Sequence, residues 1–527
     1  MTITTLDYAV VACACGLSLA LFKKQRAKRY SLPLPPGPPC WPFIGALPSV
    51  PQDVEIWKVF AQWGDKYGDI CYARFLNQDI IILNSFDDAV ELLDRRSATY
   101  SSRPEMVMAG EVVGWNFALG LLPYNDRMRR TRRFLQGGMS VKAMPELWPQ
   151  QEQETIKFVR RLLDTPEQLN EHIRQTAGAT ILKLTYGYNV ESPNDRFVVL
   201  ADTAMEMFST VTTPGAFIVD IFPILRYLPW APFKSQARKW RKLLNDFIEL
   251  PMKFKTGEGE SCLATRWLDR EVTSKEQPKE MTQYNESIIK WAAMTMYAGG
   301  SDTASLEASH PPTLTTRWQT ASAISMFFAL MTAYPEVQEK AHAEITRVIG
   351  TDRLPTYSDR SSLPYVEAVY KEVLRWHPIV PIGLPHRLDA KADDEYRGMR
   401  IPRGSTVFAN IWKMLYNPKS YHNPTTFDPE RFMGPPESIE QNPEDIAFGF
   451  GRRRCPGVNV AHSSVWFAIV LTLATYSITP KLGSDGKPIL PSLKCTNGTI
   501  SHPEPFQCKI TPRSPKAMAL VQDTSTM

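Results

Sequence analysis

Several features typical of other protein classes are missing from this sequence. The 527 residues include only 8 cysteines, with no Cys-x-x-Cys pair and no His/Cys cluster at zinc spacing, which argues against a disulfide scaffold or a zinc site. The net charge is only +5 and the basic residues lie in local clusters, so no nucleic-acid-binding surface is expected. No interior stretch has the composition of a linker and no repeat occurs. One large globular domain is therefore expected.

Residues 1–30 predict a membrane anchor with a basic flank. Residues 6–22 are apolar apart from Asp7, which is slightly shorter than the ~20 residues of a full span but within the observed range. A basic run, residues 23–29, follows directly, whereas a cleaved signal peptide, the alternative, carries its positive charge before the apolar run. Because basic flanks stay on the cytosolic side, the rest of the chain is expected in the cytosol. Residues 31–50 are rich in proline and predict a stiff spacer, with a docking site for SH3-type partners as the alternative.

The stretch from Phe448 to Gly457 is the most informative in the chain. It places Cys455 in a basic loop bounded by glycines, directly before an apolar segment, residues 458–475, that predicts a helix. Neighbouring cations and the helix N-terminus would stabilise a thiolate there, as a nucleophile or as an axial metal ligand. A basic turn around a buried structural cysteine is the alternative interpretation.

Five positions, Phe448, Gly451, Arg453, Cys455 and Gly457, match the spacing Phe-x-x-Gly-x-Arg-x-Cys-x-Gly, which resembles the haem-binding loop of cytochromes P450. The resemblance covers nearly everything from residue 33 to 513 and implies a mainly α fold with small peripheral β-sheets. It also implies haem b, with Cys455 as the axial iron ligand and with Phe448, Arg453 and Gly457 beside the cofactor. The expected parts are the anchor (1–30), a proline hinge (31–50), the P450 catalytic domain (51–515) and a disordered tail (516–527).

Local patterns within this domain predict its secondary structure. Residues 70–75 and 80–83 predict a β-hairpin with Asn77 in the turn. Helical patterns dominate from about residue 87 to residue 395, including residues 363–377, and residues 396–407 predict a short β-rich passage.

A charge network is expected behind the haem. Glu372 and Arg375 are three residues apart, so they share one face of a predicted helix and can pair. Together with Arg431 they resemble the family's buried Glu-Arg-Arg network, a structural feature that needs all its partners. A solvated surface pair is the alternative for Glu372 and Arg375 alone.

Two further positions resemble residues that bind the haem propionates. Arg132 matches an arginine that has this role in the family, whereas Met128 stands where the family has a tryptophan, so one propionate contact fewer is expected. His386, which follows Pro385, is the second candidate, against the alternative of a structural or pH-sensitive histidine. Further arginines near Arg132 and Cys455 are expected to form a positive face for an acidic electron donor: Arg127, Arg129, Arg130, Arg133, Arg452 and Arg454.

The sequence from Ala298 to Thr303 resembles the oxygen-binding turn of the family's central helix. Gly299 and Gly300 each cost about 1 kcal/mol relative to alanine in a helix, and the resemblance explains them as room for dioxygen beside the iron. It implies that Thr303 hydrogen-bonds dioxygen in the site and that Asp302 relays protons to it, as a general acid. A helix that ends in a glycine cap is the alternative.

Residues 305–321 depart from the family pattern. They intervene where the helix should continue directly into the apolar segment from Ser322, and Pro311 with Pro312 would break a helix there. One hypothesis is that the block is translated intron sequence. If the block belongs to the natural protein, it interrupts the central helix just beyond its catalytic turn and puts activity in doubt.

The resemblance implies a membrane-anchored monooxygenase of the fungal microsomal type, similar to the O-methylsterigmatocystin oxidoreductase-like group. It would use dioxygen, with electrons from NADPH through a separate NADPH–cytochrome P450 reductase and with cytochrome b5 as a further candidate donor. The expected location is the endoplasmic reticulum membrane, with one span and a cytosolic catalytic domain. A P450-type isomerase or peroxygenase and a catalytically impaired haem protein are the alternatives.

A lipophilic small molecule is the expected substrate, in the range of terpenoids, steroids, polyketides and aromatic compounds. The resemblance to the family implies that its contacts come from residues 106–122, 208–233, 294–300, 379–384 and 498–502. Residues 217–230 are expected either to enter the bilayer or to form a buried loop between helices.

The intron hypothesis predicts splice-site consensus sequences at both edges of the block in genomic DNA. It also predicts full-length transcripts that lack the block. Sequencing of genomic DNA and of transcripts measures both, and transcripts that retain the block would rule the hypothesis out.

Overall fold

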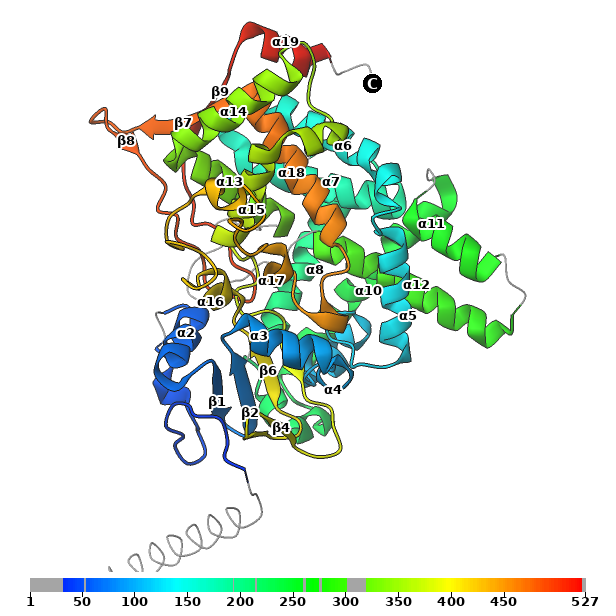
Figure 1. Cartoon of the computed structure of the whole chain (residues 1–527). Helices are drawn as coiled ribbons and strands as arrows, with labels where there is room; N and C mark the ends of the chain where they lie inside the picture. Colours follow the sequence, from blue (N-terminus) through cyan, green and yellow to red (C-terminus); the bar gives the residue numbers. More distant parts are fainter. Residues whose placement is uncertain are drawn as a thin grey trace, which may run out of the picture.

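The computed structural model describes residues 32–51, 54–192, 194–213, 216–258, 262–273, 277–300 and 319–523. In this part of the chain, helices form the bulk of the molecule and small sheets lie at its edges (Figure 1). The predicted mainly α fold with small peripheral sheets is confirmed. The predicted anchor, residues 1–30, lies outside the described residues.

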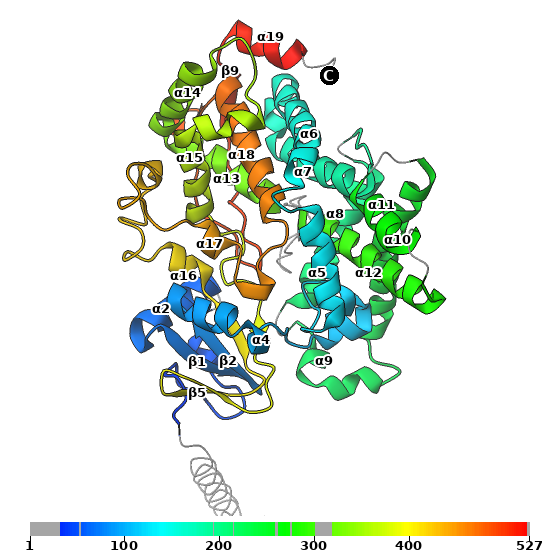
Figure 2. The same cartoon turned by 45° about the vertical axis from the view of Figure 1, so that its right-hand side comes forward.

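Long helices make up most of the molecule and pack side by side in both views (Figures 1 and 2). Before the central gap they are α2 (Ile56–Tyr67), α5 (Asp126–Gly138), α6 (Met144–Asp164), α7 (Leu169–Tyr186), α8 (Arg196–Thr212), α10 (Phe233–Glu258) and α12 (Lys279–Gly300). After it they are α13 (Gln319–Ala333), α14 (Pro335–Ile349), α15 (Pro364–Trp376), α18 (Val458–Thr475) and α19 (Pro515–Asp523). The shorter α-helices are α3 (Phe86–Ala89), α4 (Ser97–Tyr100), α9 (Ile218–Ile221), α11 (Leu263–Leu268), α16 (Ile411–Leu415) and α17 (Glu444–Ala447).

Within the described ranges, three small sheets accompany the helices. The largest has the order β1-β2-β6-β3 and contains β1 (Ile70–Phe75), β2 (Gln78–Leu83), β6 (Thr406–Ala409) and β3 (His386–Arg387). The predicted hairpin is confirmed, since β1 pairs antiparallel with β2 from Ile70 opposite Leu83 to Phe75 opposite Gln78. The other sheets are β4 (Asp394–Tyr396) with β5 (Met399–Ile401), and β8 (Pro488–Ile489) with β7 (Tyr476–Leu482) and β9 (Cys508–Pro512). The β-rich passage begins at His386, earlier than predicted, because the two-residue strand β3 is defined by its pairing with β6 and has no local pattern.

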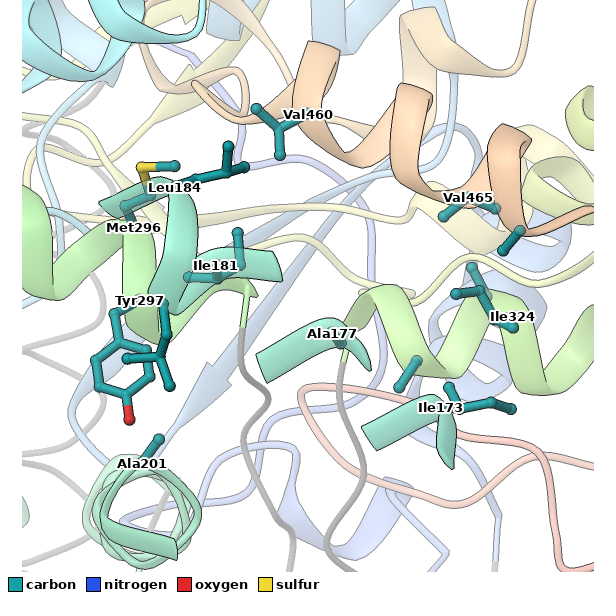
Figure 3. Packing of buried hydrophobic residues seen from close by; sticks show 14 of the residues in the cluster. Ile173, Ala177, Ile181, Leu184, Ala201, Met296, Tyr297, Ile324, Val460 and Val465 are labelled. Carbon is teal, nitrogen blue, oxygen red and sulfur yellow. The ribbon is translucent and has the colours of Figure 1, made fainter. Parts of the chain in front are cut away.

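Helix α18 lies at the centre of the helical core. It matches the predicted range, contacts α6, α13, α14 and α15, and is buried on all sides along most of its length. Figure 3 shows Val460 and Val465 of α18 pointing toward side chains of α7, α12 and α13. Among the described residues α18 is the one helix long and apolar enough to cross a membrane, but 67% of it is buried, as in a core helix.

The proline-rich segment is attached to the sheets by its backbone. The carbonyl of Pro33 accepts a hydrogen bond from the Arg400 amide at 2.8 Å, and that of Pro36 accepts one from the Tyr72 amide at 3.0 Å. From Pro33 onward the segment is therefore part of the folded body and not a separate spacer.

The expectation of a disordered tail is wrong for residues 516–523, because they form most of helix α19. Ala517 and Val521, four residues apart, are buried on one face of α19, which contacts α6 and α18. This pair of small apolar residues is too weak a pattern to stand out in a polar sequence. Residues 524–527 lie outside the described part of the chain.

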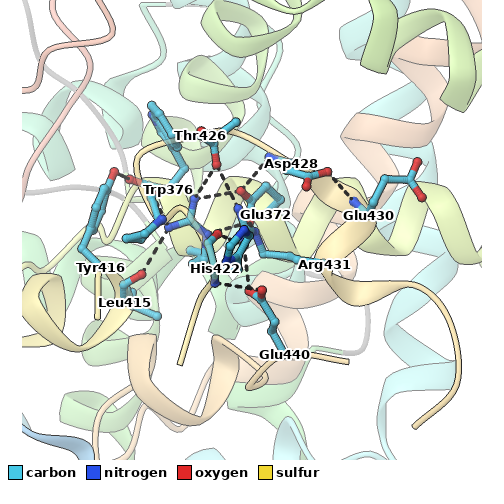
Figure 4. Close-up of polar contacts among 12 residues, drawn as sticks. Glu372, Trp376, Leu415, Tyr416, His422, Thr426, Asp428, Glu430, Arg431 and Glu440 are labelled. Carbon is cyan, nitrogen blue, oxygen red and sulfur yellow. Dashed lines mark hydrogen bonds and ion pairs between the residues drawn. The ribbon is translucent and has the colours of Figure 1, made fainter. Parts of the chain in front are cut away.

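The predicted charge network is confirmed, and it has a fourth member. The Glu372 carboxylate accepts hydrogen bonds from Arg375 Nε at 2.7 Å and Nη2 at 2.8 Å, and Arg431 Nε lies 3.1 Å from it (Figure 4). Arg431 also donates to Glu440 at 2.7 Å, which the sequence did not indicate. The side chains of Glu372 and Arg375 are 0% exposed. Arg375 also donates to the Leu415 and Pro424 carbonyls, so the network joins α15 to the loops that follow α16.

Removal of the central carboxylate should unfold the chain at lower denaturant concentration. Glu372→Ala leaves two buried guanidiniums without their partner, which costs about 3–5 kcal/mol of unfolding free energy. Lys58→Ala removes an exposed ion pair with Glu55 and should cost less than about 1 kcal/mol. Urea unfolding of the detergent-solubilised chain, followed by tryptophan fluorescence, compares the two. Equal midpoints would contradict the structural role of the network.

Candidate active site

The loop that carries Cys455 is fixed by its own backbone and by a close approach to a neighbouring helix. The Cys455 amide donates to the Phe448 carbonyl at 2.8 Å, which closes the loop between α17 and α18. Gly451 has a φ of +53°, and a Cβ there would lie 2.2 Å from the Leu93 carbonyl oxygen in the π-helix Val90–Arg95. The loop therefore needs glycine at position 451 to pack this closely against the Val90–Arg95 helix. Cys455 follows as a half-buried residue, three positions before α18 begins.

The environment of the Cys455 thiol differs from the expectation of a thiolate stabilised by charge alone. Burial raises the pKa of the thiol, and this outweighs the lowering by the Gly457 amide and by the guanidiniums of Arg132 and Arg454. A metal cation at Sγ would reverse the balance, because a coordinating thiol loses its proton. Among the described residues no group of three or more His, Cys, Asp and Glu side chains is placed to hold a metal ion.

Cys455 lines a largely apolar cavity of about 400 Å³. Phe448 and Gly457 of the loop line it too, together with Ala298 and Gly299 near the end of α12. Its other apolar side chains include Trp115, Met205, Phe208, Ile379, Val380 and Ile500. Such a cavity suits an apolar ligand or cofactor with few polar contacts.

Three buried or half-buried arginines line the same cavity. Arg453 donates to the carbonyls of Ser101 at 2.6 Å and of Leu119 at 3.1 Å, and Arg132 donates to the Arg454 carbonyl at 2.5 Å. Arg103, which sequence reasoning missed, is 7% exposed and donates to the Leu384 and Pro385 carbonyls at 2.8 and 2.6 Å. Its Nε has no hydrogen-bond partner in the described part of the chain. An arginine directly before a proline, Pro104, at the start of an apolar stretch was the only signal for it.

Burial lowers the pKa values of all three arginines, and no carboxylate of the described residues offsets this effect. Burial lowers the pKa of Arg453 to about 9, and Arg132 adds to this effect. Burial also lowers the pKa of Arg103, to which Arg453 and Arg132 contribute, and that of Arg132 itself. A buried charge without a partner costs several kcal/mol. The cluster therefore fits a ligand that carries carboxylates, such as the two propionates of a haem.

His386 lies beside this cluster but is less suited to donate to an anion. It is 6% exposed, and its Nδ1 is 2.8 Å from the Tyr100 carbonyl, which can only accept, so Nδ1 carries the proton. Burial, with Arg103 nearby, lowers the pKa of His386 well below its usual value. In the neutral ring Nε2 has no proton to donate. Contact with a propionate would require a second proton on the ring, which the propionate charge favours.

The two glycines of the predicted oxygen-binding turn have different surroundings. A Cβ at Gly299 would meet nothing within 4 Å, whereas one at Gly300 would lie 2.0 Å from Ile181 Cγ1 in α7. Gly299 therefore leaves space beside the cavity, and Gly300 permits close packing of α12 on α7. Asp302 and Thr303 lie outside the described residues, as does most of the block 305–321. Helix α12 ends at Gly300, before the block, and α13 begins at Gln319, within its last three residues.

Each predicted substrate segment contributes to the cavity, but only in part. Trp115, Phe208, Ile379, Val380 and Ile500 line it, as expected. Other apolar side chains of these segments do not: Met106, Met108, Phe117, Phe217 and Phe222. Ile181 of α7 and Met205 of α8 line the cavity although no motif indicated them.

The sequence comparisons agree with this fold and site. The chain matches the family cytochrome P450 over residues 35–311 and 313–510, so it belongs to that family. It is 40% identical over 523 residues to cytochrome P450 monooxygenase 208 of Postia placenta, covering 98% of this chain and 97% of the relative. Over 518 residues it is 39% identical to cytochrome P450 monooxygenase claR of Ampulloclitocybe clavipes, covering 96% and 91%. It is likewise 37% identical over 535 residues to cytochrome P450 monooxygenase COX2 of Coprinopsis cinerea, covering 99% and 97%.

The protein is accordingly a cytochrome P450 monooxygenase with fungal relatives. Membership implies a haem with a cysteine thiolate ligand, a redox partner and a small-molecule substrate. The Cys455 thiol, the apolar cavity and the arginines that meet no carboxylate of the described residues fit such a haem.

Loss of Arg103 should weaken retention of the haem. Arg103→Leu removes a charged donor from the cavity, and a charged hydrogen bond is worth about 1.5–3 kcal/mol, so haem should leave roughly 10-fold to 100-fold faster. Transfer of haem to apomyoglobin measures the rate. Arg129→Leu is the matched control, because the Arg129 side chain is 54% exposed and its loss should not change the rate of haem release. If both variants lose haem at the same rate, Arg103 does not contact it.

Proposed function

We propose that Cys455 ligates the iron of haem b, and that Arg103, Arg132 and Arg453 bind its propionates, with His386 beside them. Phe448 and Gly457 pack next to the cofactor. The observation that carries this proposal is that Cys455 and all three arginines line one largely apolar cavity. Bound there, a thiolate-ligated haem supplies activation of dioxygen, because the thiolate pushes electron density that favours O–O cleavage. The chain's own residues orient the substrate, exclude water and deliver protons.

Proton delivery is assigned to Asp302 and Thr303, which follow Gly299 and Gly300 in sequence. Asp302 relays protons from solvent, and Thr303 hydrogen-bonds the oxygen that receives them. The open space at Gly299 supports the assignment, because dioxygen must fit beside this turn.

The substrate is a lipophilic small molecule, in the range of terpenoids, steroids, polyketides and aromatic compounds. The aromatic and aliphatic lining of the cavity supports this class, since such walls bind apolar ligands and a few polar groups orient them. Similarity to fungal P450 monooxygenases supports a role in secondary or xenobiotic metabolism. The O-methylsterigmatocystin oxidoreductase-like type is proposed from the sequence motifs alone.

Electrons come from NADPH through a separate reductase, with cytochrome b5 as a further donor. Arg129, Arg133 and Arg452 line a surface groove of about 740 Å³ that shares Arg132 with the cavity. Such a groove suits an acidic partner protein. Arg127 does not belong to this surface, contrary to expectation: it lies 4.4 Å from the Phe117 ring centre and donates to Ser287 Oγ at 2.7 Å.

The catalytic domain lies on the cytosolic face of the endoplasmic reticulum membrane, attached by residues 6–22. An exposed apolar loop supports contact with the bilayer: Ile218, Phe222, Ile224, Tyr227 and Trp230 are 56–76% exposed. The alternative of a buried loop between helices is wrong. An apolar surface of this kind marks a membrane or partner contact.

The test is turnover by microsomes that contain the full chain and a fungal NADPH–cytochrome P450 reductase. With isotopically labelled dioxygen and a panel of lipophilic compounds, one labelled oxygen atom should enter the product only when NADPH and reductase are present. Cys455→Ser should abolish this incorporation, since a hydroxyl does not replace the thiolate. A second chain that lacks residues 305–321 shows whether the block impairs turnover.

Two outcomes would favour the alternatives. Product formation from an organic hydroperoxide, without reductase, would identify an isomerase or peroxygenase. Haem with a thiolate-type reduced carbon monoxide spectrum but no turnover by either chain would identify an impaired haem protein.

A further inference from the structure

A chain of buried polar side chains lies behind one wall of the cavity. Ser322 of α13 and His377, directly after α15, are 1% and 3% exposed. Ser322 Oγ lies 2.8 Å from His377 Nε2 and 2.9 Å from the Ser501 carbonyl oxygen. Cys495 Sγ lies 3.3 Å from His377 Nδ1. The chain thus joins three segments that are far apart in the sequence.

The direction of each hydrogen bond follows from the partners. The Ser501 carbonyl can only accept, so the single Ser322 hydroxyl proton points to it. His377 Nε2 must then donate to Ser322 Oγ, which leaves Nδ1 of the neutral ring as the acceptor for the Cys495 thiol. Burial lowers the pKa of His377 to about 3 and raises that of Cys495 to about 12, so both groups stay neutral in this arrangement.

The hydrogen-bonded residues Ser501 and His377 are close in sequence to residues that line the cavity. Ser501 follows Thr499 and Ile500, which line the cavity, and the Ser501 amide donates to the Ile379 carbonyl at 2.8 Å. Ile379 and Val380, which also line the cavity, follow His377 by two and three residues. The Thr496 amide and the His502 carbonyl close the loop between them at 2.8 Å.

We propose that Cys495, His377 and Ser322 are positioning residues that hold Ile379, Val380, Thr499 and Ile500 as one wall, and that this wall decides how a bulky ligand lies in the cavity. This rests on the proposed function, in which the cavity holds the haem and the substrate. The Ser322 hydroxyl and the Ser501 amide attach the 495–503 loop to α13 and to the segment after α15. Loss of the hydrogen bonds among Cys495, His377 and Ser322 should therefore release the 495–503 loop without removing any side chain that lines the cavity.

The test compares two azole ligands that bind the same iron. Imidazole is too small to contact the wall, whereas the phenyl ring of phenylimidazole extends into the cavity and contacts it. The ratio of the two dissociation constants therefore measures how firmly the wall is held in place. Both constants come from difference spectra of the haem-loaded full chain. Ser322→Ala and Cys495→Ala should reduce the preference for phenylimidazole about fivefold, the effect of one lost hydrogen bond. Cys495→Ser keeps a donor and should retain the preference.

Amide hydrogen exchange gives a second readout that does not depend on haem. In the same variants the peptide that spans residues 495–503 should lose protection, because the Ser501 carbonyl is no longer held by Ser322 and the bond from the Ser501 amide to the Ile379 carbonyl opens more often. Gln338→Ala is the matched control. Gln338 is 1% exposed and bonds both the amide and the carbonyl of Ile478 in β7 of the C-terminal sheet, at 2.7 and 2.9 Å, but it does not line the cavity. The Gln338→Ala variant should lower the free energy of unfolding and leave the ratio of the two azole dissociation constants unchanged.

The proposal is overturned if Ser322→Ala keeps both the azole ratio and the protection of the unmodified chain. It is also overturned if Gln338→Ala changes the ratio as much. Should Ser322→Ala not fold, the comparison of Cys495→Ala with Cys495→Ser decides, because Cys495 is half-buried and both replacements are small. Absence of any azole spectrum in the unmodified chain would instead contradict the proposed function.

Discussion

Uncompensated positive charge at the Cys455 cavity is the constraint on which the site depends. Arg103, Arg132 and Arg453 are fixed by backbone carbonyls from widely separated segments, and no carboxylate of the described residues pairs with them. The same burial that lowers their pKa values raises the pKa of the Cys455 thiol. In the proposed function a haem would offset both costs, because its propionates would compensate the arginines and its iron would favour the thiolate form of Cys455.

The Glu372 network shows the contrasting arrangement. There Arg375 and Arg431 meet the carboxylates of Glu372 and Glu440, and the remaining donors meet backbone carbonyls. A network that is closed by its own acids requires no ligand and can hold the loops after α16 in place. The two arginine clusters therefore differ: one meets carboxylates of the described residues, and the other does not.

Local sequence patterns predicted the features whose geometry is local. The Cys455 loop, helix α18, the β1–β2 hairpin and the pairing of Glu372 with Arg375 each depend on residues that are close in sequence, and each lies where expected. Arg103 and the contact of Ser322 with His377 depend on partners from distant segments, so no spacing indicated them. Glu440 is nine residues from Arg431 but lies in a loop, where no regular spacing predicts a contact. The helix α19 and the strand β3 were missed because packing and strand pairing, rather than local pattern, define them. The predicted proton-delivery residues Asp302 and Thr303 lie outside the described residues.

Iron X-ray absorption of the purified full chain tests the central claim most directly. The account predicts one sulfur ligand at a haem iron in the unmodified chain, none in Cys455→His, and weaker iron retention in Arg103→Leu. A haem iron without sulfur ligation in the unmodified chain, or sulfur ligation that persists in Cys455→His, would contradict it.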